Sequence, residues 1–283
     1  MNQKTQSLLL GIVTICCWGS LATFGNLLIH LPPFYVLGIV FLIGSIPSWF
    51  KPKEFFPAPK ILLWGVMGYF GYHFFLFYSF RFAPAIEANL INYLWPVIMV
   101  ILASVIYPEK KLKVYHIIGA ALSVLGSVLL ISGKGADLKW ENMLGYFLAF
   151  CAALTWPIYS IGKKKMPATS IWAVGSFCLV SSLLCFLTHF LLGPRVVLQT
   201  KDLWVLVAMG IGPFGIAFYC WDLALRKGDA RVIGALAYLT PVLSTLGLVL
   251  FADQEMVPTT FYSMLLIIGG AGMGLLDFFP VKR

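Results

Sequence analysis

Residues 84–107 read PAIEANLINYLWPVIMVILASVIY, and Glu87 is the only charged residue among them. A helix needs about 20 predominantly apolar residues to cross the roughly 30 Å hydrocarbon core of a bilayer. This run is long enough, and it lacks the alternation of polar and apolar residues that marks a membrane β-strand. It therefore predicts a membrane-spanning α-helix, whose backbone polar groups are satisfied within the segment.

Nine similar runs flank this one. The ten predicted spans are 7–29, 34–50, 61–80, 84–107, 114–131, 144–161, 171–192, 204–225, 232–251 and 260–279. The whole chain is 60% hydrophobic and 11% charged, whereas a soluble domain carries about 25% charged residues. No joint between spans is long enough to hold a soluble domain. We predict an all-α integral membrane protein with ten transmembrane helices.

The net charge of +9 is distributed unevenly across these spans. One side of the predicted arrangement carries only Arg81, Lys134, Lys139, Arg195 and Lys201. The other side, which includes both termini, carries all remaining lysine and arginine residues. Cytoplasmic loops of membrane proteins are enriched in these residues. We therefore expect a multi-pass protein of the cytoplasmic (inner) membrane with both termini in the cytoplasm, and we interpret the basic excess as a topology signal rather than a nucleic-acid-binding surface.

Part of the 84–107 run recurs in the second half of the chain at a constant offset. The aligned pairs are Arg81 with Arg226, Ala85 with Ala230, Tyr93 with Tyr238, Leu94 with Leu239, Pro96 with Pro241, and Val97 with Val242. Their shared order indicates a duplication, with one five-helix repeat in residues 1–139 and a second in residues 140–283. Because five is odd, the second repeat is expected to insert upside down. Inverted repeats are a recurring transporter design, with the binding site near the midplane.

Aromatic residues lie near the centres of several spans, although Trp and Tyr usually lie at the membrane interfaces. These central residues are Trp18, Tyr93, Trp95, Trp156 and Tyr238. Simple packing explains any one of them taken alone. Together they favour a shared cavity in the middle of the membrane.

The fourth span adds a polar face to this set. Asn89, Asn92, Tyr93 and Pro96 follow the i, i+3, i+4, i+7 spacing of one helix face. Asn side chains in hydrocarbon need partners, so we expect this face to point into protein or a wet cavity. Pro96 and Pro241 each remove a backbone donor. They predict helix breaks that line the cavity, and harmless kinks are the alternative.

Few ionisable residues lie deep in the spans. His73, next to Tyr72 in the third span, is a candidate functional group by its depth, although buried polar packing is the usual role of such a residue. Glu87 and Asp222 lie near span ends, where we expect structural pairs with Arg81 and Arg226. No acidic relay lies at mid-depth and no ATP-binding motif is present in the sequence. We expect a gradient-driven facilitator without a cofactor.

Two further patterns have mainly structural interpretations. The six cysteines all fall inside predicted spans without metal-ligand spacing, so we interpret them as small apolar fillers and expect no metal site. Gly270 and Gly274 form a G-x-x-x-G pattern that indicates a close helix contact. This contact can lie within one chain or in a homodimer, and the pattern does not distinguish them.

The chain resembles a known family of transporters. Ten spans, a five-plus-five duplication, Cys17-Trp18-Gly19 and the proline-centred fourth and ninth helices are similar to the EamA-type drug/metabolite transporter superfamily. Gly71-Tyr72-His73 and Asn92-Tyr93-Leu94-Trp95-Pro96 resemble its aromatic amino acid exporter branch. The resemblance implies a basket-like helical fold and efflux of amino acids and similar metabolites. It also implies a central cavity lined by Tyr72, His73, Tyr93, Trp95 and Trp156. Pro157 departs from the family pattern, which has a small residue there, and we expect it to bend the sixth helix.

These observations favour one function over two others. The leading prediction is a secondary transporter, not an enzyme, that exports an aromatic or neutral amino acid by alternating access. Its aromatic faces would hold the ring and the ammonium group, and Asn89, Asn92 and His73 would take the carboxylate. The alternative is a transporter of cationic or quaternary-amine metabolites or drugs. A more distant alternative is a membrane enzyme or receptor, but the sequence lacks clustered mid-depth catalytic residues and a signalling domain. The expected partners are a small-molecule substrate and the lipid bilayer.

Overall fold

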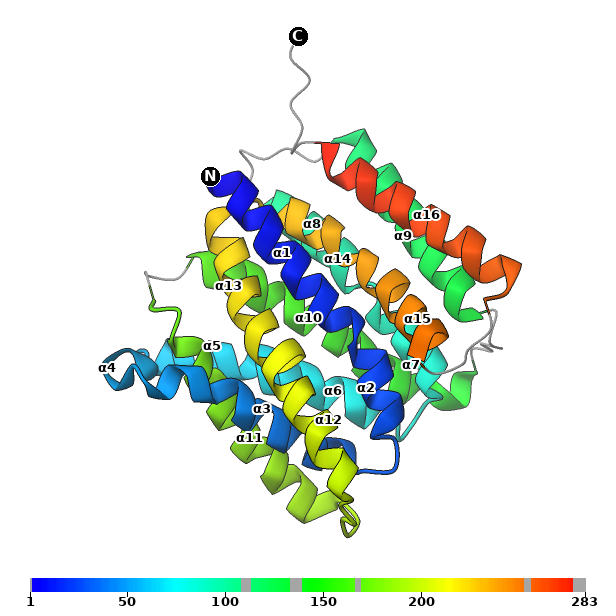
Figure 1. The fold of residues 1–283 in the computed structure, drawn as a ribbon. Helices are drawn as coiled ribbons and strands as arrows, with labels where there is room; N and C mark the ends of the chain where they lie inside the picture. The colour runs from blue at the N-terminus through cyan, green and yellow to red at the C-terminus, as the bar shows by residue number, and fades with distance from the viewer. Residues whose placement is uncertain (1, 108–112, 133–138, 166–168, 252–255, 277–283) are drawn as a thin grey trace.

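The computed structural model describes residues 2–107, 113–132, 139–165, 169–251 and 256–276. Their regular structure is helical (Figure 1). The helices are α1 (Gln3–Gly19), α2 (Leu21–Leu27), α3 (Pro33–Trp49), α4 (Pro52–Phe55), α5 (Pro59–Val66), η1 (Met67–Gly71), α6 (Tyr72–Ser79), α7 (Ala85–Asn92), α8 (Trp95–Ile106), α9 (Val114–Ser132), η2 (Trp140–Asn142), α10 (Met143–Lys165), α11 (Ala173–Leu192), α12 (Thr200–Ile211), η3 (Gly212–Ile216), α13 (Ala217–Lys227), α14 (Ala230–Ala237), α15 (Leu239–Phe251) and α16 (Pro258–Gly274).

Among the described residues, 7 helical segments are long and apolar enough to cross a membrane. They are Gln3–Leu27, Pro59–Ser79, Ala85–Ile106, Trp140–Lys163, Ala173–Leu192, Thr200–Lys227 and Ala230–Phe251. Pro33–Trp49 and Val114–Leu130 are shorter apolar helices, and α16 has 17 residues. The prediction of an all-helical membrane protein is confirmed. The number of ten spans stays a prediction.

Two of the three proline positions coincide with interruptions of a helix. Pro96 lies in the first turn of α8, where its missing N–H is not needed, and α7 ends at Asn92. Pro241 lies in the first turn of α15, just after α14 ends at Ala237. Pro157 differs, because α10 continues through it without a break. Proline removes only its own backbone hydrogen bond, and the rest of the helical ladder continues on both sides.

Two short π-helical segments interrupt the membrane-spanning segments Pro59–Ser79 and Thr200–Lys227. Segment η1 lies between α5 and α6, and η3 lies between α12 and α13. At the offset that aligns Arg81 with Arg226, Met67 aligns with Gly212 and Gly71 with Ile216, so the two segments occupy equivalent positions of the repeat. Such π-turns are rare and often mark functional sites.

The pair α9 and α16 lies along one side of the molecule (Figure 1). A Cβ atom on Gly270 would lie 2.4 Å from the Gly119 carbonyl oxygen, and one on Gly274 would lie 2.4 Å from Ala235 Cβ. The G-x-x-x-G pattern of α16 therefore packs within the chain, against α9 and α14. The homodimer stays a prediction.

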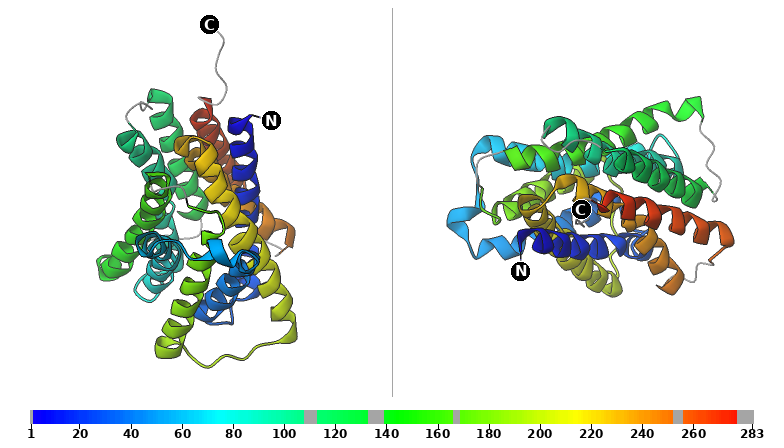
Figure 2. Two further views of the ribbon diagram at one scale, coloured as in Figure 1. Left: turned by 90° about the vertical axis from the view of Figure 1, so that its left-hand side faces the viewer. Right: turned by 90° about the horizontal axis from the view of Figure 1, so that it is seen from above.

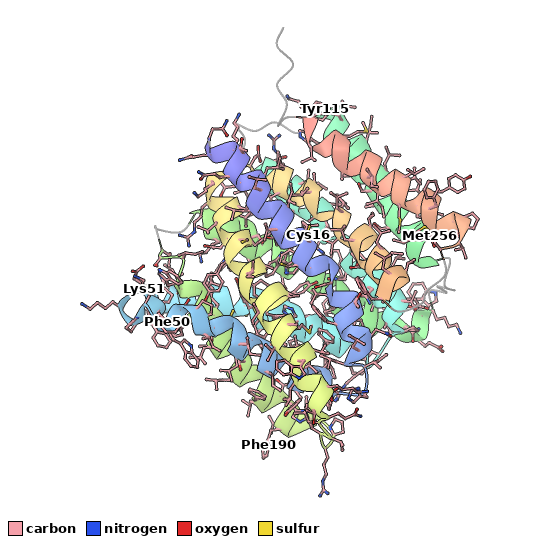
Figure 3. All side chains as sticks on the ribbon, viewed as in Figure 1. Cys16, Phe50, Lys51, Tyr115, Phe190 and Met256 are labelled. Carbon is pink, nitrogen blue, oxygen red and sulfur yellow. The ribbon has the colours of Figure 1, made fainter. Side chains whose placement is uncertain are left out.

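The helix ends gather on two opposite sides of the bundle. Helix α1 crosses the front of the molecule between α13 and α15, and it packs against both (Figures 1 and 2). Figure 3 shows Lys51 and Tyr115 toward the left and the top, whereas Phe190 and Met256 lie toward the bottom and the right. Lys51 and Tyr115 adjoin joints that the sequence assigns to one side of the membrane, and Phe190 and Met256 adjoin joints that it assigns to the other.

Candidate functional site

Four tryptophans from four different helices meet in the middle of the molecule. The ring centroids of Trp18 lie 5.0 Å from Trp221, 5.6 Å from Trp156 and 6.3 Å from Trp95. Trp221 also lies 5.9 Å from Trp95 and 6.0 Å from Trp156. All four side chains are buried. Three of these five pairs are edge-to-face, a geometry that the ring quadrupoles prefer, and the other two are tilted. We call Trp18, Trp95, Trp156 and Trp221 the tryptophan cluster.

Trp221 was not predicted as a site residue. It lies on α13 one residue before Asp222, near the charged end of its span, where a tryptophan is usually an interface residue. Its helical spacing from Phe218 was the available signal, because both residues lie on one face of α13. Phe218 contacts Trp18 and Trp156 at 6.2 and 5.8 Å between centroids.

The π-helical segments hold two of the predicted site residues in place. The Tyr69 carbonyl oxygen in η1 lies 2.7 Å from His73 Nδ1, and the Pro213 carbonyl oxygen in η3 accepts from Trp18 Nε1 at 3.2 Å. A carbonyl oxygen can only accept, so Nδ1 of His73 carries the proton. The His73 ring is buried between Phe41 and Phe214 at 5.1 and 5.4 Å. Each π-turn thus presents a backbone oxygen to an aromatic N–H of the site.

Tyr72 and Asn92 connect the third and fourth spans beside this cluster. Asn92 is buried, and its Nδ2 donates to the Tyr72 hydroxyl at 3.1 Å. The Tyr72 ring lies 4.9 Å from His73 and 5.8 Å from Trp156. The structure therefore brings Trp18, Tyr72, His73, Asn92, Trp95 and Trp156 together.

Three predicted site residues are less closely tied to the cluster. Asn89 and Tyr93 are half-buried on the α7 side and make no ring contact with the four tryptophans. Tyr238 is buried in a separate apolar cluster with Val242, Met264 and Ile267. Repeat equivalence to Tyr93 suggested Tyr238, but α16 covers this position in the second half.

A buried ionic group lies beside the tryptophan cluster, toward the side that carries both termini and most of the lysines, which we call the lysine-rich side. Asp222 Oδ2 lies 2.5 Å from Arg226, which confirms the expected pair, and Asp222 Oδ1 lies 3.3 Å from Lys163 Nζ. The Lys163 side chain is 6% exposed and that of Asp222 is 2% exposed. Lys163 Nζ also lies over the Phe177 ring, 4.4 Å from its centroid. The sequence did not predict Lys163 as a buried partner, because Lys164 and Lys165 follow it.

The expected pair of Glu87 with Arg81 is not formed. Glu87 accepts a short hydrogen bond from the Tyr146 hydroxyl, and Arg81 donates to the Leu192 carbonyl oxygen at 2.9 Å. Glu87 lies in the first turn of α7, whereas Arg81 lies beyond the end of α6. Each side chain therefore reaches a different neighbouring helix, α10 for Glu87 and α11 for Arg81.

Comparisons with known proteins agree on one family. The model of the EamA-like transporter family matches residues 5–132 and again residues 143–275. The aromatic amino acid exporter YddG of Ancylobacter novellus is 33% identical over 96% of this chain and 98% of its own length. A probable amino-acid metabolite efflux pump of Salmonella typhimurium is 24% identical over 95% of this chain and 94% of its own. A crystal structure that is 32% identical matches with a TM-score of 0.92, covering 97% of this chain and 98% of its own.

Proposed function

Because the chain belongs to the EamA-like transporter family, we propose that it is a secondary transporter of the cytoplasmic membrane that exports aromatic or neutral amino acids. The observation that carries this proposal is the tryptophan cluster, which joins residues from both matched segments. Trp18 and Trp95 belong to the first segment, and Trp156 and Trp221 to the second. A site at the interface of two repeats, near the membrane midplane, is typical of transporters.

The chemistry of the cluster suits an aromatic zwitterion. Aromatic rings stack on or pack edge-to-face against a cargo ring. Their faces also attract an ammonium group, with about 2 kcal/mol or more of attraction when the cation is desolvated. The relatives that match most of this chain carry the names of an aromatic amino acid exporter and an amino-acid metabolite efflux pump, which supports this cargo class.

Alternating access by exchange of conformations between the halves follows when the two halves are inverted, and the arginines of the repeat support this arrangement. Arg81 donates to the carbonyl oxygen of Leu192, the last residue of α11. Its repeat partner Arg226 donates to the carbonyl oxygens of Thr169 and Ser170, just before α11 begins. A helix of 20 residues is about 30 Å long. Equivalent residues therefore bind opposite ends of one helix, as ten spans in two inverted sets of five would require.

Transport by the purified full-length protein in liposomes tests the proposal. We expect preloaded phenylalanine or tryptophan to exchange with labelled amino acid outside, without ATP. A Trp18→Ala variant should slow the exchange at least several-fold, because Trp18 contacts the other three tryptophans. Labelled choline provides the competing outcome. Movement of choline without any amino acid would favour the cationic cargo class and overturn the export of amino acids.

A further inference from the structure

Four buried hydrogen-bond donors near the tryptophan cluster lack an acceptor in good geometry. They are the Tyr69 hydroxyl, Trp156 Nε1, the Tyr159 hydroxyl and Lys163 Nζ, and none makes a well-aligned hydrogen bond among the described residues. The two tyrosine hydroxyls interact with each other, and Lys163 interacts with Asp222 and with the Phe177 ring. Buried polar groups are almost always hydrogen-bonded, so several unpartnered donors in one place point to a missing acceptor.

These donors lie next to one another in the core. Trp156, Tyr159 and Lys163 follow i, i+3, i+7 spacing on one face of α10. The Tyr69 ring lies 5.8 Å from Trp156 and 5.4 Å from Tyr159. Beyond them, Phe177 contacts Tyr69 at 5.8 Å and lies under Lys163 Nζ. This row of side chains leads from Trp156 in the tryptophan cluster to the buried ammonium group of Lys163 at the lysine-rich end.

Several other donors around the cluster are already engaged. His73 Nδ1 is taken by Tyr69, Asn92 Nδ2 by the Tyr72 hydroxyl and Trp18 Nε1 by Pro213. Trp221 Nε1 donates to Ser160 Oγ at 3.1 Å. The Tyr72 hydroxyl accepts from Asn92 and keeps its own proton free. The Tyr69–Lys163 side differs in offering an anionic group of the cargo a buried ammonium group as well as neutral donors. This differs from the sequence-based expectation that Asn89, Asn92 and His73 take the carboxylate.

Asp222 is suited to be a removable partner of Lys163. A buried charge that loses its only counter-ion is strongly destabilising, but Asp222 keeps Arg226 at 2.5 Å when Lys163 turns away. Lys163 would exchange the carboxylate of Asp222 for that of the cargo, so its charge would stay paired. The distance from Lys163 to Asp222 is 3.3 Å, longer than the 2.5 Å between Asp222 and Arg226.

We propose that the carboxylate of the transported amino acid binds to Lys163, to Trp156 Nε1 and to the hydroxyls of Tyr69 and Tyr159. When the transporter is empty, Asp222 is the ion-pair partner of Lys163. The inference rests on the proposed function, and it assigns the group that distinguishes an amino acid from the corresponding amine. Cargo that enters from the lysine-rich side meets this site before it reaches the tryptophan cluster.

Binding of two ligands to the detergent-purified full-length protein tests the site. Phenylalanine carries a ring, an ammonium group and a carboxylate, whereas phenylethylamine lacks only the carboxylate. We expect Lys163→Met to weaken phenylalanine binding by about tenfold or more, the effect of losing a hydrogen bond to a charged group. Phenylethylamine binding should change little. Tyr159→Phe removes one neutral donor and should weaken phenylalanine binding roughly 2–10-fold.

Lys227→Met is the matched control, because it removes the same charge at the same end of the molecule. Lys227 donates to Gln6 and has no contact with the cluster. If Lys163→Met melts far below wild type, the Tyr159→Phe result decides, since the Tyr159 hydroxyl makes no well-aligned hydrogen bond and the ring is kept. The carboxylate site alone is overturned if Tyr159→Phe and Lys163→Met leave phenylalanine binding unchanged. It is also overturned if these variants weaken the binding of phenylalanine and phenylethylamine equally. A wild-type protein that neither binds nor exchanges phenylalanine overturns the proposed function, and the site with it.

Discussion

At the scale of single residues, a position near the centre of a predicted span was a better guide to the tryptophan cluster than helical spacing. Trp18, Trp95 and Trp156 could be predicted because a tryptophan in mid-span lies away from its usual interface. Asn89 was chosen by spacing along one helix, which says nothing about the neighbouring helix, and its side chain makes no described contact with the cluster. Trp221 was missed because Asp222 and Arg226 follow it, yet it contacts three of the predicted residues.

Trp221 provides the test of this residue-scale view. We expect Trp221→Leu to raise the KM for a transported aromatic amino acid several-fold, because each aromatic contact contributes about 0.5–1.5 kcal/mol beyond its buried area. The control is Trp204→Leu, since Trp204 is 75% exposed on the outside of the bundle. Exchange assays in liposomes measure both variants. Equal effects of the two substitutions would contradict a site at the tryptophan cluster.

At the scale of helices, the existence and type of the elements could be predicted, but their irregularities only in part. Proline indicated the interruptions before Pro96 and Pro241, because it cannot donate to the helical ladder. The π-turns at η1 and η3 were not predicted. A π-turn contains one residue more than an α-helical turn. Whether it forms depends on packing against other helices, and the pattern of residues along one helix does not show this. The available signal was a pair of glycines three residues apart within each segment, Gly68 and Gly71 in η1 and Gly212 and Gly215 in η3.

Two glycines of η1 test how tightly this π-turn is packed. A Cβ atom on Gly68 would lie 2.2 Å from the Tyr159 ring, whereas one on Gly71 would have its nearest neighbour at 3.7 Å. We expect Gly68→Ala to destabilise the protein by roughly 1–3 kcal/mol through overpacking, and to lower its melting temperature by several degrees. Gly71→Ala should be neutral or stabilising by up to about 1 kcal/mol, from helix propensity. Thermal unfolding in detergent measures both, and similar melting temperatures for the two variants would show that Tyr159 moves aside freely.

At the scale of the whole molecule, the helical membrane class could be predicted from composition and length alone, because hydrocarbon demands internally bonded segments. The sequence could not predict which helices pack together. Apolar residues surround most of these helices, so no narrow stripe identifies a partner. The pairing of α9 with α16 depends on Gly119 and Gly270 meeting at one level, a three-dimensional match rather than a sequence period.

The orientation of the two halves is the property on which transport depends, and two equivalent positions test it. Phe82 and Lys227 stand one residue after Arg81 and Arg226, and both are exposed. In a cysteine-free background, we expect a membrane-impermeant maleimide to label Phe82→Cys on intact cells. Lys227→Cys should be labelled only after the membrane is permeabilised, because the lysine-rich side is predicted to face the cytoplasm. The two cysteines are related by the repeat, so inverted halves must present them to opposite compartments. Labelling of both from the same compartment would make the halves parallel, and the exchange of inward-open and outward-open states by symmetry would then have no structural basis.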